Sequence, residues 1–230
     1  MELFNSLIKD TLELLKPFKS REYPYSENEL WNDEGHSSVI LQRDCAYELK
    51  GTGFNLVTSS ELSDRVIVCG KELKEIKSDC SFVRISLISV ENTDDEQKAF
   101  DLIKKAEYVK YHVFPEGYMI RSTSTSNKEA VRISKKALRK GIDFYKTGNL
   151  LISKYKEIPE VKAVTVIFVT EQSASFEAFF KIAEKSTSIT KALNHIMEKV
   201  NFDCDSCNLK PLCDEVEGMR ELHFKSAGRM

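Results

Sequence analysis

The sequence has no long apolar run and no excess of charge of either sign. No stretch approaches the roughly 20 apolar residues of a membrane-spanning helix, so we expect no membrane-embedded part. Lys and Arg number 34 and Asp and Glu number 36, giving a net charge of -2. So balanced a chain has no field that would gather nucleic acid or anionic lipid. The opening residues MELFNSLIKDTLELLK mix charges with apolar residues, unlike a signal peptide, which favours a cytoplasmic location.

Signatures of several enzyme classes are missing too. The sequence contains neither the G-x-S-x-G turn of serine hydrolases nor the H-E-x-x-H of zinc proteases. Gly51 and Gly53, in KGTGFN, are too few for a phosphate-binding loop, and no helix is expected directly after them. His36 and His112 have no partner at the spacing of metal ligands. These absences disfavour both hydrolase classes and a nucleotide-binding loop.

Apolar periodicity indicates an α/β fold with a mixed sheet flanked by helices. Residues 162–170, KAVTVIFVT, are almost wholly apolar and β-branched, which is typical of a central strand covered on both faces. Residues 81–90 alternate apolar and polar side chains, as a half-buried strand does. The early strands are too close in sequence for helical crossovers, so the sheet should be mixed.

The expected elements divide the chain into three parts. Residues 1–36 form an N-terminal helix and arm, residues 37–200 the α/β domain, and residues 201–230 a short cysteine-containing appendage that binds metal. The expected helices are 3–16, from Thr93 to about 109, 134–140, from 144 to Pro159, from Ser173 onward, and 188–200. The expected strands are 37–42, 54–58, 65–69, 81–90, 111–114, 118–122, 129–133 and 162–170.

Three cysteines lie close together in the C-terminal run FDCDSCNLKPLCDEVEGMRELH. Cys204 and Cys207 have the C-x2-C spacing that lets two thiolates on one turn converge on one metal. Cys213 follows within reach of a small loop that Pro211 stiffens. Because thiolates bind both structural zinc and iron–sulfur clusters, this motif predicts a metal site without choosing the metal.

A closed site needs a fourth ligand, and the sequence leaves its identity open. His223 lies ten residues beyond Cys213 and is one candidate. The other candidates are a cysteine of a partner chain and the three remaining cysteines, Cys45, Cys69 and Cys80. These three lie on or beside expected strands, where the simpler interpretation is that they are small core residues.

Two stretches, 46–73 and 130–171, carry a family likeness. The first reads AYELKGTGFNLVTSSELSDRVIVCGKEL, in which a Glu-Leu pair and glycines lead into a Val-Cys-Gly-Lys-Glu-Leu turn. The second begins AVRISKKALRKGIDF and ends in the apolar strand. With the cysteine motif that follows them, they resemble the middle domain of the β-subunit of the carbon monoxide dehydrogenase/acetyl-CoA synthase complex.

That resemblance implies the fold of the middle domain, an anaerobic setting, and kinship with an acyltransferase that joins a methyl group, carbon monoxide and coenzyme A. It favours an iron–sulfur cluster, of the 4Fe-4S type, over zinc, and a protein partner in a one-carbon complex. The sequence departs from the family in having three clustered cysteines instead of four and no nickel-binding Cys-Gly-Cys. Whether the chain is an enzyme is therefore left open, and a non-catalytic accessory or scaffold module is the alternative.

A basic stretch suggests a second kind of site. Arg132 is followed by Lys135, Lys136 and Arg139 on the expected helix 134–140, where they share one side. Arginines of the family's middle domain are thought to face coenzyme A, so the resemblance implies that these four residues bind its phosphates. The alternative is a solvated helix face.

Overall fold

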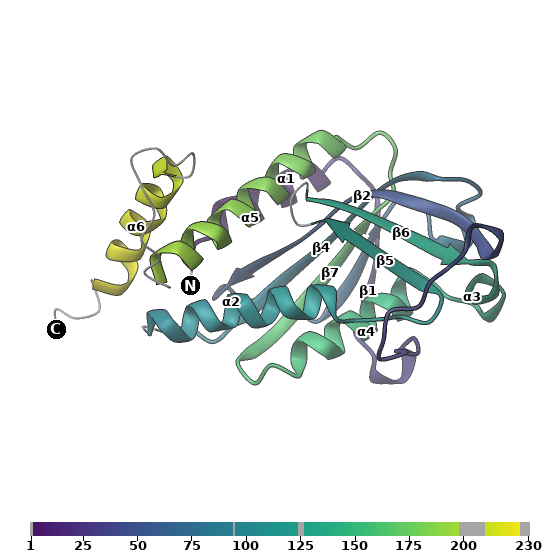
Figure 1. The fold of residues 1–230 in the computed structure, drawn as a ribbon, viewed down its shortest axis with the longest axis horizontal. Coiled ribbons are helices and arrows are strands. Elements are labelled where there is room, and N and C mark those ends of the chain that lie inside the picture. Colours follow the sequence, from purple (N-terminus) through teal and green to yellow (C-terminus); the bar gives the residue numbers. More distant parts are fainter. Residues whose placement is uncertain (1, 94, 124–126, 198–209, 226–230) are drawn as a thin grey trace.

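The computed structural model describes residues 2–93, 95–123, 127–197 and 210–225. They form an α/β structure in which one seven-stranded mixed sheet lies between two layers of helices (Figure 1). Within these residues, no helix combines the length and the apolar character needed to cross a bilayer.

The sheet has the strand order β1-β3-β7-β4-β2-β6-β5. Two neighbouring pairs, β2 with β4 and β3 with β7, are parallel, and the other four pairs are antiparallel. The mixed sheet expected from the close spacing of the early strands is therefore confirmed. The strands are β1 (Ser20–Pro24), β2 (Cys45–Thr58), β3 (Arg65–Cys69), β4 (Cys80–Val90), β5 (Tyr118–Thr123), β6 (Lys128–Ser134) and β7 (Val161–Val169).

Strand β7 lies in the interior of the sheet, as its apolar sequence predicts. It pairs with β3 on one side and β4 on the other, and only Lys162 among its residues is exposed. Helices cover both of its faces, and this is why its apolar residues do not alternate with polar ones. Phe168 on this strand stacks on Phe144 of the helix layer, with ring centroids 4.4 Å apart.

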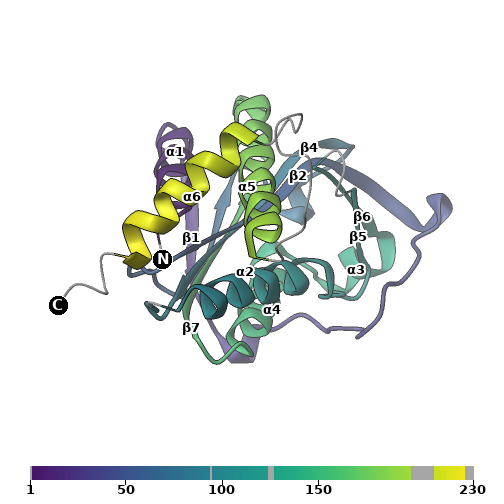
Figure 2. The ribbon, with the colours of Figure 1, turned by 60° about the vertical axis from the view of Figure 1, so that its left-hand side comes forward.

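Two helices cover each face of the sheet. On one face α1 (Asn5–Leu15) packs beside α5 (Phe176–Met197), and on the other α2 (Glu96–Tyr111) packs beside α4 (Phe144–Lys156) (Figures 1 and 2). The short α3 (Lys135–Lys140) follows β6 directly and ends at Gly141, whose left-handed backbone closes the helix as expected.

Some expected elements are wrong, for local reasons. Residues 37–42 form no strand, because only Ile40 of the apolar run is buried while its neighbours Val39 and Leu41 are exposed. Residues 111–114 form no strand either, since α2 extends to Tyr111. The two helices expected after Ser173 are one continuous helix, α5. The polar strand β1 was missed, as its pairing with β3 at the sheet edge depends on backbone hydrogen bonds.

The N-terminal arm is fastened to the domain. Trp31 donates a hydrogen bond from Nε1 to the carbonyl of Glu116, 2.8 Å away, and packs against the core. Asp33 forms an isolated bridge with Pro115. The arm therefore runs along the domain, and Trp31 anchors it there.

The C-terminal part of the described chain is a helix, α6 (Lys210–Lys225), that packs on α5. Val216 is fully buried in this contact, and Lys185 of α5 lies 3.8 Å from Glu215 of α6. In Figures 1 and 2, α6 lies beside the C-terminal half of α5.

Candidate functional site

A cavity of about 770 Å³ lies where the N-terminal end of α5 passes over β2, β5 and β6. We call it the α5 cavity. Phe176 and Phe180 from α5 form one wall, and Arg121, Lys128 and Lys50 from the strands line the opposite side. The volume falls within the range of small-molecule and cofactor sites.

The cavity exists because several strand residues under the N-terminal end of α5 have small side chains. Gly51, Thr52 and Ala130 form part of its lining, so little side-chain volume rises from the strands. No residue with a side chain fits at position 51, because a Cβ atom there would lie 1.7 Å from the carbonyl oxygen of Phe82 on β4. Further along β2, Phe54 and Leu56 are fully buried and part of the core.

Three cations line the cavity, and they differ in their partners. Lys50 lies 3.3 Å from Asp79. Lys128 begins β6 and also lines the cavity. Arg121, by contrast, is exposed and makes no ion pair or side-chain hydrogen bond with any residue that the structure describes. Its guanidinium is therefore the group best placed to bind an anion, since it can donate two parallel hydrogen bonds to a carboxylate or phosphate.

The N-terminal end of α5 also faces the cavity, and Glu177 of its first turn belongs to the lining. The capping residue is Ser175, whose Oγ accepts a hydrogen bond from the backbone of Ala178. The helix expected from Ser173 onward begins later, at Phe176, and the hydroxyl of Ser173 donates to Glu171 instead. The partial positive charge of a 22-residue helix thus lies at one wall of the cavity.

Arg132, one of the four residues assigned to coenzyme A, is held close to this cavity. Its Nε donates to Glu48, 2.8 Å away, and its Nη1 donates to the carbonyl of Ile40. The hydrogen bond with Glu48 raises the pKa of Arg132. Because Glu48 itself lines the α5 cavity, Arg132 neutralises a carboxylate that would otherwise repel an anionic ligand there.

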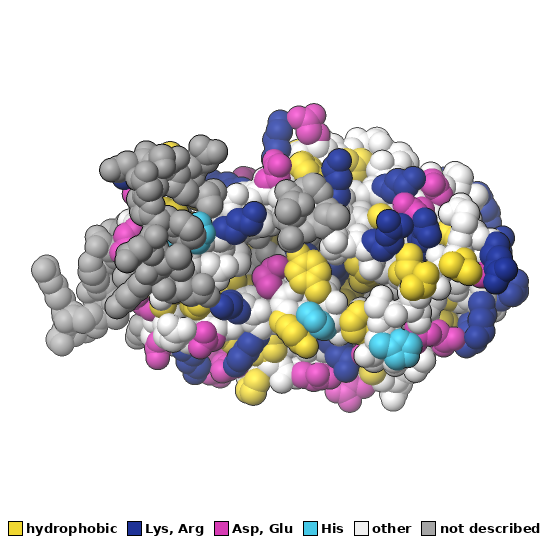
Figure 3. Space-filling model, in the orientation of Figure 1, with side chains coloured by type: hydrophobic (Ala, Val, Ile, Leu, Met, Phe, Trp, Pro, Cys, Tyr) yellow, Lys and Arg dark blue, Asp and Glu magenta, His cyan; other side chains and the backbone are white. Residues whose placement is uncertain are grey.

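The other three residues of that assignment line a separate cavity of about 540 Å³, which we call the α3 cavity. Lys135, Lys136 and Arg139 lie there together, so the structure brings them to one place but separates them from the α5 cavity. Three carboxylates, those of Glu34, Asp44 and Glu116, line the α3 cavity as well. Figure 3 shows Lys and Arg side chains gathered over β2, β5 and β6, with acidic side chains between them.

Beneath the sheet, on the face that α2 covers, lies a buried ion pair. Arg84 of β4 and Glu129 of β6 form two hydrogen bonds, of 2.7 and 3.0 Å, and each side chain is only 1% exposed. Burial is the largest single effect and by itself lowers the pKa of Arg84, but the charge and the hydrogen bonds of Glu129, with smaller contributions from Tyr155 and Tyr118, together raise it. The two side chains meet across the intervening strand β2, above Gly53, where a Cβ atom would lie 2.3 Å from the Glu129 carboxylate.

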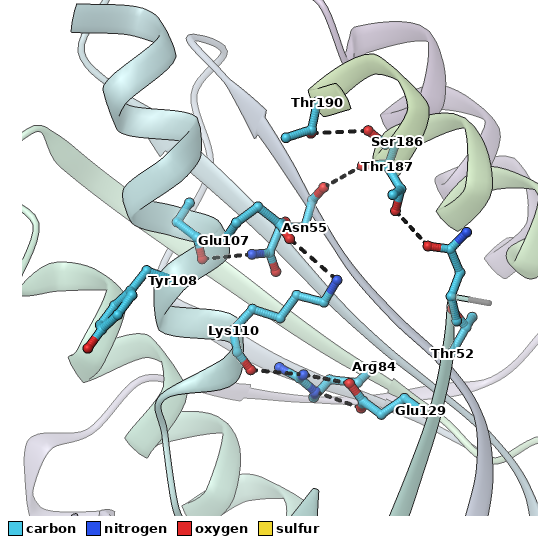
Figure 4. Close-up of polar contacts among 12 residues, drawn as sticks. Thr52, Asn55, Arg84, Glu107, Tyr108, Lys110, Glu129, Ser186, Thr187 and Thr190 are labelled. Carbon is cyan, nitrogen blue, oxygen red and sulfur yellow. Dashed lines mark hydrogen bonds and ion pairs between the residues drawn. The ribbon is translucent and has the colours of Figure 1, made fainter. Parts of the chain in front are cut away.

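Hydrogen bonds of polar side chains join this region to the helices (Figure 4). Asn55 of β2 donates from its side chain to the carbonyl of Ala106 on α2 and accepts from the hydroxyl of Tyr155 on α4. Its backbone carbonyl accepts from Ser186 on α5. Asn55 therefore connects β2 to helices on both faces of the sheet, which fixes the position of β2 relative to these helices.

The cysteines do not come together in the described part of the chain. Cys204 and Cys207 lie outside the described residues, as does the side chain of His223. Cys213 is half-buried on α6 and packs against the core. Among the described residues no three His, Cys, Asp or Glu side chains form a group that could hold a metal ion.

The three other cysteines lie far from α6. Cys45 begins β2, Cys80 begins β4, and Cys69 ends β3, all at the end of the sheet opposite α6 (Figure 1). Cys69 is buried, and burial raises its pKa to about 11. Cys45 is buried as well and donates from Sγ to the carbonyl of Tyr47. They are thus built into the sheet, away from Cys213.

Two kinds of comparison bear on these sites. The chain matches no model of a known protein family. It also has no match among curated proteins. The interpretation of the site therefore rests on its geometry and on the sequence resemblance.

Proposed function

We propose that this protein binds a small organic anion with an apolar body in the α5 cavity. The observation that carries the proposal is that the guanidinium of Arg121, which has no ion-pair partner among the residues that the structure describes, shares one cavity of about 770 Å³ with a wall formed by Phe176 and Phe180. A ligand that places its anionic group on Arg121 buries its apolar part against the phenylalanines. Ligand sites in proteins combine an apolar lining with a few polar groups in this way.

An acyl thioester of coenzyme A is the ligand that agrees with the resemblance to the acetyl-CoA synthase β-subunit. Such a molecule has phosphates for the cations and an acyl-pantetheine arm for the apolar wall. On this proposal the chain takes part in anaerobic one-carbon and acyl-CoA metabolism in the cytoplasm. Its role is that of a binding component beside a partner subunit, either of an acyltransferase or as an accessory module.

Fluorescence of 1-anilinonaphthalene-8-sulfonate, an aromatic organic anion, tests the cavity directly. We expect one molecule to bind the full chain saturably and acetyl-CoA to displace it. Arg121→Ala should weaken binding about 10-fold, because it removes charge-assisted hydrogen bonds. Phe180→Ala should weaken it by removing apolar contact area.

Arg43→Ala is the matched control, since it removes the same charge from an exposed position outside the cavity lining. It should leave binding unchanged. Binding that is not saturable, or that Arg121→Ala and Phe180→Ala leave intact, would overturn the proposal. Binding of the fluorescent anion that acetyl-CoA does not displace would reject coenzyme A thioesters as the ligand.

The α3 cavity is a second place to test for coenzyme A phosphates. The shared location of Lys135, Lys136 and Arg139 favours it, and the nearby carboxylates of Glu34, Asp44 and Glu116 oppose it. Changing Lys135 and Arg139 together to Ala separates the two places. If acetyl-CoA binding falls in that variant and stays unchanged in Arg121→Ala, its phosphates bind at the α3 cavity.

We also propose that Cys204, Cys207 and Cys213 hold a metal centre, of the 4Fe-4S type by resemblance and with zinc as the alternative. Thiolates are suitable ligands for either. Cys213 supports the proposal because it lies half-buried on α6, where a metal ligand would be fixed to the domain by the packing of α6 on α5. When bound, such a cluster supplies either electron transfer or structural support. His223 or a partner cysteine remains the proposed fourth ligand.

Metal analysis and electron paramagnetic resonance of anaerobically purified protein test this centre. We expect iron and sulfide in the full chain, and their loss in Cys204→Ser and Cys213→Ser. Cys80→Ser is the control, because Cys80 lies at the opposite end of the sheet. Stoichiometric zinc without iron would reject the cluster, and absence of any metal would reject the centre.

A further inference from the structure

Asn127, the residue directly before β6, accepts hydrogen bonds from two other elements, and we call this pair of bonds the Asn127 clasp. Asn127 accepts a hydrogen bond at its side-chain oxygen from the hydroxyl of Thr187 on α5, at 2.8 Å. Its backbone carbonyl accepts one from the hydroxyl of Thr52 on β2, at 2.7 Å. Figure 4 shows Thr187 and Thr52 on the two elements that the clasp joins.

All three elements joined here contribute to the α5 cavity. Thr52 itself is part of the cavity lining, and Lys128, the residue after Asn127, lines the cavity from β6. Thr187 lies on α5 seven residues after Phe180, so the two residues face the same side of the helix. The clasp therefore connects three parts of the cavity lining: β2, the start of β6 with Lys128, and α5 with its phenylalanines.

The backbone conformation at Asn127 explains why an asparagine occupies this position. Its φ of 50° lies in the left-handed region, and it is the one residue other than glycine with positive φ in the described part of the chain. Asparagine tolerates this conformation better than other residues with side chains. A glycine would adopt it more readily but would lack the amide oxygen that accepts from Thr187.

We propose that Asn127 is a positioning residue for ligand binding in the α5 cavity. It sets the separation between the phenylalanines of α5 and the cations of the β5–β6 hairpin, so that one ligand can contact both. The inference rests on the proposed function, since it specifies how the same cavity is held at its binding width. Preorganisation of this kind lowers the cost of ordering the site when the ligand binds.

Three variants test the clasp, with 1-anilinonaphthalene-8-sulfonate as the probe and the full chain as the protein. Asn127→Gly keeps the backbone conformation and removes the bond to α5, and Thr187→Val removes the same bond from the other side. Each should weaken binding about 3- to 10-fold, as expected for the loss of one hydrogen bond. The double variant should lose no more than either single variant, because both remove one interaction.

Thr187→Ser is the rescuing variant, because its hydroxyl can still donate to the side-chain oxygen of Asn127 and it adds no charge near the anionic probe. It should restore most of the affinity, whereas a general loss of stability would not be reversed by it. Thermal unfolding of each variant shows whether the fold is retained. If the unaltered chain binds the probe but Asn127→Gly and Thr187→Val bind it equally well, or if the two effects add, the positioning role is wrong. If the unaltered chain does not bind, the proposed function itself fails.

Discussion

Arg84 and Glu129 meet across a strand that belongs to neither of them. Arg84 is on β4 and Glu129 on β6, and β2 lies between them. Side chains from second-neighbour strands reach each other here because Gly53 of β2 has no side chain in the way. The pair thus links β4 to β6 across β2, and Glu129 also belongs to the lining of the α5 cavity. The need for space above β2 explains why glycine occurs at position 53 without a phosphate-binding loop.

Replacing the glycine under the ion pair should destabilise the fold. In Gly53→Ala the new Cβ atom would lie 2.3 Å from a carboxylate oxygen of Glu129, which the ion pair with Arg84 holds in place. We expect a loss of about 1–3 kcal/mol in the free energy of unfolding, measured by urea titration with circular dichroism. Gly218→Ala is the control, because nothing lies within 4 Å of a Cβ atom there. It should be neutral or slightly stabilising, since alanine favours a helix.

Replacing one residue of the Arg84–Glu129 pair should lower the free energy of unfolding more than replacing both residues. Arg84→Met leaves the Glu129 carboxylate buried without its partner, and we expect a loss of about 3–5 kcal/mol in the free energy of unfolding. Changing both residues to Met should recover a large part of this loss, because no uncompensated charge remains. Lys181→Ala, at an exposed pair with Glu177, should cost about 0–1 kcal/mol. Additive losses in the double variant would contradict this account.

Acid should weaken the contact between Arg21 and Glu75. The hydrogen bond from Arg21, with a second from the backbone of Glu72, lowers the pKa of Glu75 from 4.5 to about 2. Because the folded state favours the charged form, its contribution is present above about pH 4.5 and is lost as the pH falls toward 2. The effect should be modest, since both side chains are partly exposed to solvent.

Urea titrations across this pH range test that contribution. The stability difference between the unaltered chain and Glu75→Gln should shrink steadily as the pH is lowered from 4.5 to 2. Arg21→Ala should show the same trend, because it removes the main cause of the shift. A difference that is constant with pH in both variants would show that the pair does not perturb the carboxyl group.

Cys69 should resist alkylation while the protein is folded. Its thiol is buried, and burial raises its pKa to about 11, so almost no thiolate is present at pH 8. Iodoacetamide at that pH should label Cys69 only in concentrated urea, as read by mass spectrometry of its peptide. Cys80, which is half-exposed, should react faster in the folded protein. Equal rates for the two would mean that the end of β3 opens readily.

The parts of the fold that could be predicted are those with a local signal. Strand β7 is apolar along almost its whole length and α4 has a clear helical period, so both were identified close to their true bounds. The strand predicted at residues 37–42 is wrong. Three adjacent apolar residues favoured it, but they pair with no strand that the structure describes, and only Ile40 is buried. Two helices were expected where α5 is continuous, and Ser186, which lies between them, is buried and donates a hydrogen bond to the backbone of Asn55 on β2.

The α5 cavity could not be predicted, because it depends on pairings between distant residues. Arg121 and Phe180 are far apart in sequence, and they line one cavity only because β5 pairs with β6 and β6 with β2. Glu129 carries no local sign of burial, since it is a charged residue next to Lys128 near the start of β6. The basic residues of α3 were noticeable because they are adjacent in sequence, although that says nothing about the carboxylates that fold against them.

The continuity of α5 has a mechanical consequence. A helix of 22 residues is a stiff rod of roughly 33 Å. One end of this rod forms the phenylalanine wall of the cavity, and α6, which carries Cys213, packs along the other half. Because the two ends of α5 cannot change orientation separately, a ligand that tilts the N-terminal end of α5 also changes how α6 packs on its other half.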